Sequence, residues 1–242
     1  MEIDHQTTVE AAAQNEKRVG ILELRLETGV LREQRDFYTQ TLELPLAEES
    51  AGQLTIRAGA TRLVFAQAAQ GKPTYHFAFD IPENKLPQAK EWLARRTPLL
   101  RRDGQEVFHF ADWNADGVYF HDPAGNVVEL IARHDLANAA PGPFAAGEIL
   151  HASEIGLVVD DVAAQVEALA GALGLALYRS ATAEFAAVGD EHRLLIVNHR
   201  GRPWWHDTPS WPYPLLASLS GREDREYRAQ GYPFTVLLRG PH

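Results

Sequence analysis

Hydrophobic and polar positions alternate in three short segments of the chain, and each segment opens a similar series of elements. The first contains LELRLE around Glu23, the second YHFAFDI around His76, and the third SEIGLVV around Glu154. Strict alternation with a period of two is typical of a β-strand that has one apolar face. Each segment is followed by an apolar stripe at helical spacing and then by further short apolar runs. The pattern predicts three β-α-β-β-β modules.

A leucine recurs at the same distance after the polar residue of each opening segment, at Leu46, Leu99 and Leu177. A fixed offset in successive copies is the mark of an internal repeat. The repeat also indicates where chemistry can be concentrated, because Glu23, His76 and Glu154 occupy equivalent positions.

The remaining elements follow from periodicity and from turn residues. In the first module we expect a helix with Leu31, Phe37, Tyr38 and Leu42 on one face, then strands at 44–47, 53–58 and 61–66. In the second we expect a helix over 86–93 and strands at 107–110, 117–121 and 127–132. In the third we expect a helix over 162–173 and strands at 176–179, 184–188 and 193–198.

The domain organisation follows from these modules. Residues 1–17 are expected to form a loose tail, 18–133 to hold modules one and two, 134–150 to form a linker, and 151–242 to hold the third module with an extension. A module of this kind leaves one sheet face uncovered, so two modules pair into a curved mixed sheet with a central cleft. The predicted class is α+β, with modules one and two forming the cleft.

The extension after the third module has an unusual composition. Residues 202–214 (RPWWHDTPSWPYP) contain four prolines and three tryptophans, and a lone strand is expected at 234–238. No fourth repeat of full size is visible. We expect the segment 202–214 to pack over the open face of the third module, with a substrate lid or a subunit interface as the alternative.

Charge and composition exclude several classes of protein. The formal net charge is −10 and no basic stripe is present, which argues against nucleic acid and against an anionic membrane surface as partners. No apolar run is long enough to span a bilayer, and the N-terminus lacks the features of a secretory signal. The chain has no cysteine, which excludes disulfides and thiolate metal sites. A cytoplasmic protein is the expectation.

The segment YFHDPAGNVVELIAR, residues 119–133, closely resembles the last-strand signature of the vicinal oxygen chelate superfamily. That superfamily includes glyoxalases, fosfomycin and bleomycin resistance proteins, and extradiol dioxygenases. Within the segment, Glu129 resembles the metal-binding glutamate of the family. Phe37-Tyr38 and the strand that begins at Glu154 match further, weaker family features, and the resemblance covers roughly residues 20–200. It implies a glyoxalase-like fold.

The resemblance also implies a ligand set. Carried over position by position, the family's ligands fall on Glu23, His76 and Glu129, although a histidine is usual where this chain has Glu23. Such a set would hold one divalent ion (Mn²⁺, Fe²⁺, Ni²⁺, Zn²⁺ or Mg²⁺), with Glu23 or Glu129 as a catalytic base. An ion pair with Arg25 on a solvated strand face would explain Glu23 equally well. Glu154 is expected to be structural, because its partner module is missing.

Further polar residues are candidates for substrate binding. His109, Trp113, Asn114 and His121 precede Glu129 and could line the cleft, while Glu184 and His192 could form a second polar site. The implied function is a metal-dependent lyase or isomerase acting on a small oxygenated molecule. An extradiol-type dioxygenase and a metal-free drug- or metabolite-binding protein are the alternatives. We expect a small-molecule substrate and a possible homodimer.

Overall fold

The computed structural model describes residues 20–206 and 208–241, so the tail expected over residues 1–17 lies outside the described residues. In the described part, fifteen strands form one mixed sheet with few helices. The main path of the sheet is β14-β15-β13-β1-β9-β5-β8-β7-β6, and the strands β2–β4 and β10–β12 branch from β1 and β9. The predicted α+β architecture of repeated modules is confirmed.

Three modules contain the expected strand, helix and three further strands. Module 1 consists of β1 (Ile21–Thr28), α2 (Leu31–Asp36), a π-helical turn (Phe37–Thr41), β2 (Leu46–Ser50), β3 (Gln53–Ala58) and β4 (Thr61–Gln67). Module 2 consists of β5 (His76–Ile81), α3 (Leu86–Ala94), β6 (Phe108–Phe110), a 3-10 turn (Ala111–Trp113), β7 (Ala115–His121) and β8 (Val127–Arg133). Module 3 consists of β9 (His151–Val159), α4 (Val162–Leu173), β10 (Leu177–Ala181), β11 (Phe185–Asp190) and β12 (Arg193–His199). The linker between modules 2 and 3 contains one 3-10 turn (Ala146–Glu148).

A reduced fourth module follows the Trp/Pro-rich segment. It consists of β13 (Leu215–Ser220), β14 (Arg225–Arg228) and β15 (Phe234–Arg239). Here β13 pairs with β15 in parallel and β14 pairs with β15 in antiparallel fashion, which repeats the pairing of β1, β4 and β3. Only the last of these strands was expected from the sequence. The module has no helix of its own, which explains why no full-size repeat is visible.

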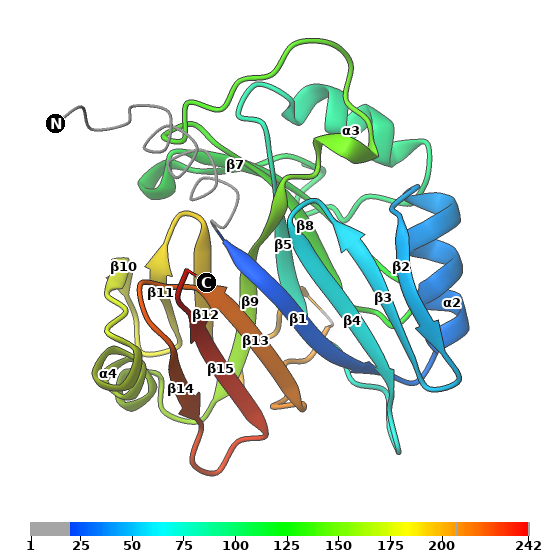
Figure 1. Cartoon of the computed structure of the whole chain (residues 1–242). Coiled ribbons are helices and arrows are strands. Elements are labelled where there is room, and N and C mark those ends of the chain that lie inside the picture. Colours follow the sequence, from blue (N-terminus) through cyan, green and yellow to red (C-terminus); the bar gives the residue numbers. More distant parts are fainter. Residues whose placement is uncertain (1–19, 207, 242) are drawn as a thin grey trace, which may run out of the picture.

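The modules pair differently from the expectation. β5 of module 2 pairs in antiparallel fashion with β9 of module 3, and β1 of module 1 pairs with β13 of module 4. Figure 1 shows β13, β15 and β14 lying beside β1, on the side away from β4. A cleft between modules one and two is therefore not formed, and the central pair is that of modules 2 and 3.

Burial along the opening strands explains this pairing. Every residue of β5 and of β9 is buried, so each strand needs cover on both of its faces. In β1, by contrast, Arg25 is exposed and Glu23 and Glu27 are half-buried. A strand without charged outer positions belongs in the middle of a covered sheet, whereas an alternating strand tolerates water on one face.

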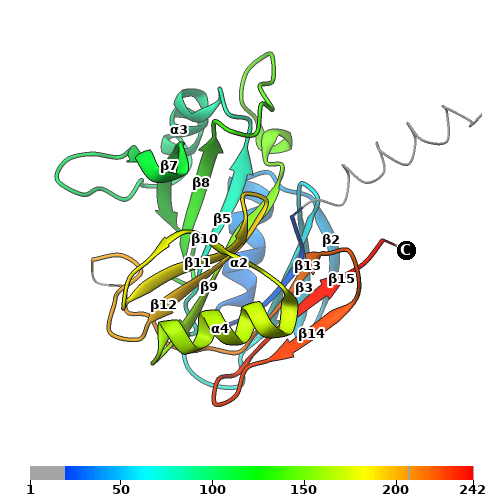
Figure 2. The ribbon, with the colours of Figure 1, turned by 90° about the vertical axis from the view of Figure 1, so that its left-hand side faces the viewer.

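The helices cover the outer faces of the sheet. α2 packs against β3 and β4, α3 packs against β7 and β8, and α4 packs against β11 and β12. α4 also packs against β14 of the reduced module, where Gln165 Nε2 donates a hydrogen bond to the Tyr227 hydroxyl at 3.0 Å. Figure 2 shows α4 lying across this side of the molecule. One helix therefore serves two modules.

The ends of α4 are fixed by local sequence. Asp161 precedes the helix and its Oδ1 accepts a hydrogen bond from the Ala164 amide at 3.0 Å, which satisfies one of the free N–H groups of the first turn. Gly174 ends the helix with a φ of 67°, a left-handed conformation that glycine adopts without steric cost. No helix in the described part of the chain combines the length and the apolar character that crossing a membrane requires.

The turn between β7 and β8 ties module 2 to module 1 through one buried carboxylate. Asp122 Oδ2 accepts hydrogen bonds from Gln34 Nε2 at 2.7 Å, from the Tyr38 hydroxyl at 2.9 Å and from Asn126 Nδ2 at 2.8 Å. Its Oδ1 accepts from the amides of Ala124 and Asn126. Burial raises the pKa of Asp122 even though these hydrogen bonds favour the charged form. The carboxylate thus holds the turn and the first helix together.

We expect Asp122→Ala to lower the free energy of unfolding by about 3 kcal/mol or more, because it leaves several buried donors without an acceptor at once. Chemical denaturation followed by circular dichroism measures the loss. Glu33→Ala, at an exposed acidic position on the same helix, is the control and should change stability by less than about 0.5 kcal/mol. Equal losses in the two variants would contradict this account of the turn.

Candidate metal centre

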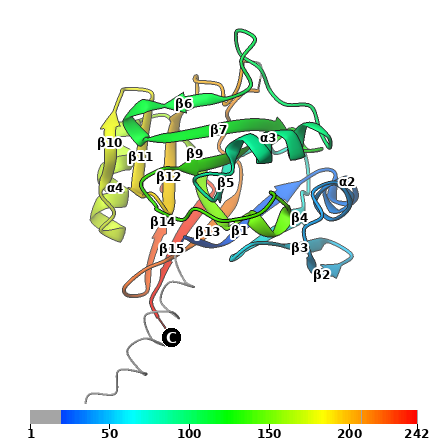
Figure 3. The ribbon, with the colours of Figure 1, turned by 90° about the horizontal axis from the view of Figure 1, so that it is seen from above.

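A cavity of about 480 Å³ lies in the cleft between modules 2 and 3. Its floor is formed by β5, β8 and β9, and its walls include residues of β6, β11 and the Trp/Pro-rich segment. Figure 3 shows β6 and β7 of module 2 and β11 and β12 of module 3, the strands that supply several of the wall residues.

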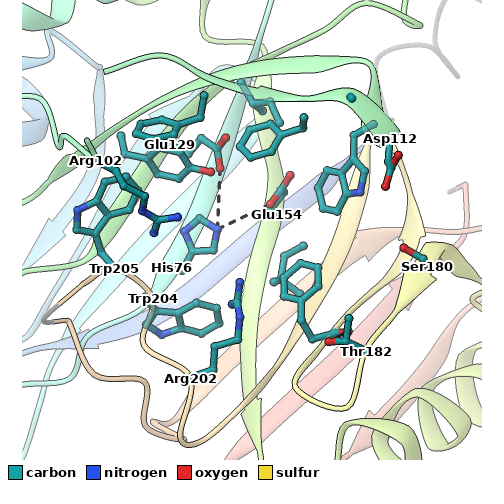
Figure 4. A pocket seen from close by; sticks show the side chains of 18 residues that line it. His76, Arg102, Asp112, Glu129, Glu154, Ser180, Thr182, Arg202, Trp204 and Trp205 are labelled. Atoms are coloured by element: carbon teal, nitrogen blue, oxygen red, sulfur yellow. Dashed lines mark hydrogen bonds and ion pairs between the residues drawn. The ribbon is translucent and has the colours of Figure 1, made fainter. Parts of the chain in front are cut away.

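Three buried ionisable side chains meet on the floor of the cavity (Figure 4). His76 Nε2 lies 4.0 Å from Glu129 Oε2 and 3.8 Å from Glu154 Oε2. The three residues come from β5, β8 and β9, and Ala78 is the partner of both Glu129 and Glu154 in the strand registers. All three ligand atoms belong to one group, in which every pair lies within 4.8 Å.

A β-bulge sets the position of Glu154. Ala78 is opposite Glu154 whereas its neighbour Phe79 is opposite Ala152, so Ser153 is an extra residue in β9. Bulges of this kind redirect side chains and occur next to functional sites. The bulge brings Glu154 onto the same face of the sheet as His76.

The two carboxyl groups differ in their electrostatic surroundings. Burial and the nearby charge of Glu154 raise the pKa of Glu129 well above its usual range, against a hydrogen bond from Tyr119. Burial also opposes ionisation of Glu154, but the nearby His76 ring, 3.8 Å away, and the charge and hydrogen bond of Arg133 hold the pKa of Glu154 below its usual value. Glu154 is thus the charged member of the pair, and Glu129 the member that retains a proton more readily.

The tautomer of His76 favours binding through Nε2. His76 Nδ1 lies 3.0 Å from the backbone oxygen of Val127, to which it donates in the neutral ring. A carbonyl acceptor at one nitrogen leaves a lone pair at the other, as in metal-binding histidines generally. The lone pair on Nε2 faces the two carboxylates.

The residues present fit a divalent cation. Glu129 Oε1 is buried and has no hydrogen-bond partner among residues 20–206 and 208–241, which is costly unless a ligand satisfies it. One imidazole nitrogen and two carboxylates suit Mn²⁺, Fe²⁺, Zn²⁺, Ni²⁺ or Mg²⁺ better than a soft-ligand copper site. With three protein ligands, the ion would keep positions open towards the cavity.

Aromatic side chains wall the cavity. The ring centroid of Trp204 lies 5.3 Å from that of His76, and Trp205 lies 5.0 Å from Tyr119. On the opposite wall Trp113 lies 6.4 Å from Phe185. Trp204 also packs against the small apolar cluster of Ala187, Leu194 and Ile196, so the segment 202–214 covers the cleft face of the third module as well as the metal centre.

Two arginines line the same cavity. The Arg202 guanidinium donates to Asn198 Oδ1 at 2.7 Å and lies over the Phe185 ring, while Arg102 lies over the Trp205 ring. Burial lowers the pKa of Arg202, and the charge of Arg102 adds to that effect. Within the described residues neither guanidinium forms an ion pair with a carboxylate. The lining therefore offers unneutralised positive charge beside aromatic faces.

Glu23 lies elsewhere. Its carboxylate accepts a hydrogen bond from Arg62 Nε at 3.2 Å and lies 3.8 Å from Arg25, at the junction of modules 1 and 4. The structure brings His76 and Glu129 together, as the resemblance implies, but Glu154 takes the third place that was expected for Glu23. The physical reason is the pairing of β5 with β9 in place of β1.

Of the four candidate substrate-binding residues, Trp113 lines the cavity. His109 is exposed and pairs with Asp116 at 2.8 Å, Asn114 donates to Asp135 at 2.6 Å, and His121 Nε2 lies 3.2 Å from Thr208 Oγ1. These three residues are not part of the lining. Glu184 and His192 do not form one polar site, since Glu184 precedes the Phe185–Asn198 pair at one end of the β11–β12 hairpin and His192 lies in the turn beyond the Asp190–Arg193 pair at the other.

Several lining residues were missed by the sequence reasoning. Tyr119 is opposite Glu129 in the β7–β8 register, which the period of the two strands could have revealed. Trp204 and Trp205 were noted for their composition but not placed at the centre, and Arg102 and Arg202 carried no recognisable signal. Glu154 carried the clearest signal, namely its repeat position.

Comparisons with known proteins bear on the fold. No protein-family model matches the chain, and no curated protein matches it in sequence. Among solved structures, a "putative dioxygenase" of Bacillus subtilis superposes with a TM-score of 0.59 at 14% identity, covering 93% of this chain and 86% of that one. Glyoxalase I of Zea mays superposes with a TM-score of 0.55 at 15% identity, covering 90% of this chain and 91% of that one. Together with the four modules and their pairing, these matches show that the chain has the fold of the vicinal oxygen chelate (glyoxalase-like) superfamily.

Proposed function

We propose that the chain is a divalent-metal-dependent enzyme that acts on a small oxygenated molecule by chelation, in a lyase or isomerase type of reaction. His76, Glu129 and Glu154 would hold the ion. The observation that carries the proposal is the convergence of these three buried side chains, from three strands, on the floor of one aromatic-walled cavity. Burying two carboxylates and an imidazole side by side is unfavourable unless a cation compensates them.

A bound divalent ion would act as a Lewis acid towards a substrate with two neighbouring oxygens. Glu129 is the candidate base, since burial raises its pKa above the usual carboxyl range and so makes it a stronger proton acceptor. The Tyr119 hydroxyl, hydrogen-bonded to Glu129, would hold that carboxyl in position. Glu154, kept ionised by Arg133, would remain a permanent negative charge of the centre.

The lining supports a substrate that is planar and anionic. Trp204, Trp205 and Trp113 present ring faces and edges to the cavity, which favours flat ligands. Arg102 and Arg202 supply positive charge, and guanidinium groups bind carboxylates through paired hydrogen bonds. Ring-cleaving dioxygenation in the cavity is less well supported, because non-haem Fe²⁺ oxygenases use two histidines and one carboxylate, whereas the cavity offers one histidine and two glutamates.

A metal-free binding protein is the second candidate. The aromatic walls favour it, since stacking on indole rings holds flat ligands without a metal. The two functions differ in one observable, the dependence of ligand binding on a divalent ion.

Removing a ligand of the centre tests the proposal. We expect His76→Ala and Glu154→Gln each to bind one divalent ion fewer per chain than the wild type after reconstitution, because each loses a ligand atom of the group. Elemental analysis of desalted protein gives the content.

Glu23→Gln is the matched control, since Glu23 is a glutamate at the equivalent repeat position that pairs with Arg62 instead. It should retain the full metal content. Unchanged metal content in His76→Ala and Glu154→Gln would sink the enzyme proposal and leave the metal-free binding protein.

The protonation of Glu129 gives a pH-dependent prediction. Because its pKa is raised, we expect Glu129 of the metal-free protein to keep its proton to a higher pH than an ordinary carboxyl group, and a bound ion to displace that proton. Affinity for the ion should therefore rise with pH until the pH exceeds that raised pKa. Infrared difference spectra on addition of Zn²⁺ should show loss of a protonated-carboxyl band, and metal-free Glu129→Gln should lack that band. A spectrum without the band in wild-type protein would contradict the assignment.

The arginines predict ligand selectivity. We expect Arg102→Gln to weaken binding of 2,3-dihydroxybenzoate about tenfold, the loss of about 1.5 kcal/mol for one hydrogen bond to a charged group, while catechol binding stays unchanged. Isothermal titration with both ligands measures this. Arg101→Gln is the control, since Arg101 pairs with Glu106 and is not part of the lining. Parallel losses for both ligands would argue against anion recognition by Arg102.

A further inference from the structure

A second group of ligating side chains lies beside the metal centre, on the other side of Arg133. It consists of Asp80 on β5, His151 at the start of β9 and His192 between β11 and β12. One ligand atom from each residue lies within 4.8 Å of the other two. None of the three residues lines the cavity described above.

The β-bulge at Ser153 creates this group as well as the first one. Asp80 is opposite His151 in the β5–β9 register, while Ala78 is opposite Glu154. In a regular strand, residues three apart point to opposite faces. With Ser153 as the extra residue, His151 and Glu154 come to the same face, each beside its own group.

The ligand atoms of this group lack other partners. Asp80 Oδ2, His151 Nε2 and His192 Nδ1 are all buried and accept or donate no hydrogen bond within the described part of the chain. The nearest approach, between Asp80 Oδ2 and His151 Nε2, is 3.5 Å. Each unsatisfied buried polar atom destabilises the folded protein, so three that converge on one point call for a common ligand.

The charge state of the residues favours a cation. Arg133 Nε donates to Asp80 Oδ1 at 3.1 Å, and the other oxygen, Oδ2, lies 3.5 Å from His151 Nε2. Burial lowers the pKa of His151, although the charge of Asp80 opposes this, so its ring is neutral near pH 7. A neutral imidazole has a lone pair to donate.

We propose that Asp80, His151 and His192 bind a zinc ion that ties module 2 to module 3. Two imidazoles and one carboxylate form a donor set that Zn²⁺ accepts in tetrahedral geometry, with water as the fourth ligand. Tetrahedral bonds of 2.0–2.2 Å place ligand atoms about 3.4 Å apart, so the group has to contract slightly around the ion. His192 is half-buried in a hairpin turn and is the residue free to make that adjustment.

The role of this ion is structural. The site lies outside the cavity, so no substrate reaches it, and its ligands join β5 of one module to β9 and the β11–β12 hairpin of the other. Arg133 spans the two groups, because it donates to Asp80 in one and to Glu154 in the other. The zinc ion would thereby fix the guanidinium that keeps Glu154 ionised.

Elemental analysis of the full chain, stripped with chelator, reloaded with Zn²⁺ and desalted, tests the proposal. We expect two zinc ions per wild-type chain, one for each group, and one in His192→Ala, which removes a half-buried ligand without disturbing the core. Asp80→Asn should lose the same ion, and Glu23→Gln should lose neither. Reloading with Co²⁺ adds a second readout, since the visible absorption of a tetrahedral Co²⁺ site should vanish in His192→Ala and persist in Glu129→Gln.

The outcomes separate this proposal from that of the metal centre. Loss of an ion in His192→Ala but not in Glu129→Gln would uphold the structural zinc site and remove the catalytic one. Loss in Glu129→Gln alone, with wild-type metal content and absorption in His192→Ala, would overturn the structural site and keep the catalytic one. A wild-type chain that binds no zinc would overturn both.

Discussion

The buried guanidinium of Arg133 is the contact on which the floor of the cleft depends. It pairs with Asp80 and with Glu154, and all three side chains are almost completely buried. Removing one member of a buried ionic network leaves an uncompensated charge and costs about 3–5 kcal/mol. The charge and hydrogen bond of Arg133 help to hold the pKa of Glu154 below its usual value. Asp80 and Glu154 each form an ion pair with Arg133. Glu129 forms no ion pair with Arg133 within the described residues, and its pKa is raised.

Much of the fold could be predicted from the sequence, because strand and helix periods are local. The opening strands at Glu23, His76 and Glu154 and the three helices lie where the patterns place them. β13 and β14 were missed, since LLASLS and REYR alternate weakly and no helical stripe separates them. The pairing of the modules could not be obtained from the repeat alone. A repeat shows which positions are equivalent but not which copies are neighbours in space.

Two of the three residues of the candidate site could be predicted from the sequence. His76 and Glu129 could be identified, the one from its repeat position and the other from the resemblance of its strand. The repeat identified the position of Glu154, but a structural role was expected for it. That expectation assumed that its partner module would follow it in the sequence, whereas the partner is module 2, which precedes it. The bulge at Ser153 depends on a cross-strand register, and the approach of Trp204 to His76 depends on a long connection. Neither leaves a local pattern that can be recognised.

The size of the residue at one repeat position indicates which modules form the cleft. Two residues after Glu23, His76 and Glu154 stand Arg25, Ala78 and Gly156. Ala78 lies between the two carboxylates of the metal centre, where a larger side chain would fill the space for an ion. A Cβ on Gly156 would lie 2.4 Å from the Trp204 ring, so only glycine allows Trp204 to pack directly against β9.

In module 1 the equivalent residue is the large, charged Arg25, and the position equivalent to Glu129 is the buried Val64. The charge of Glu23 is consequently neutralised by the side chains of Arg25 and Arg62, and no metal ion is needed there. Modules 2 and 3 converge at the cleft, and packing there requires small residues such as Ala78 and Gly156. Module 1 does not take part in the cleft and can carry the large Arg25. The candidate site is thus confined to one of the two module pairs by the size of a neighbouring residue as much as by the side chains that could bind an ion.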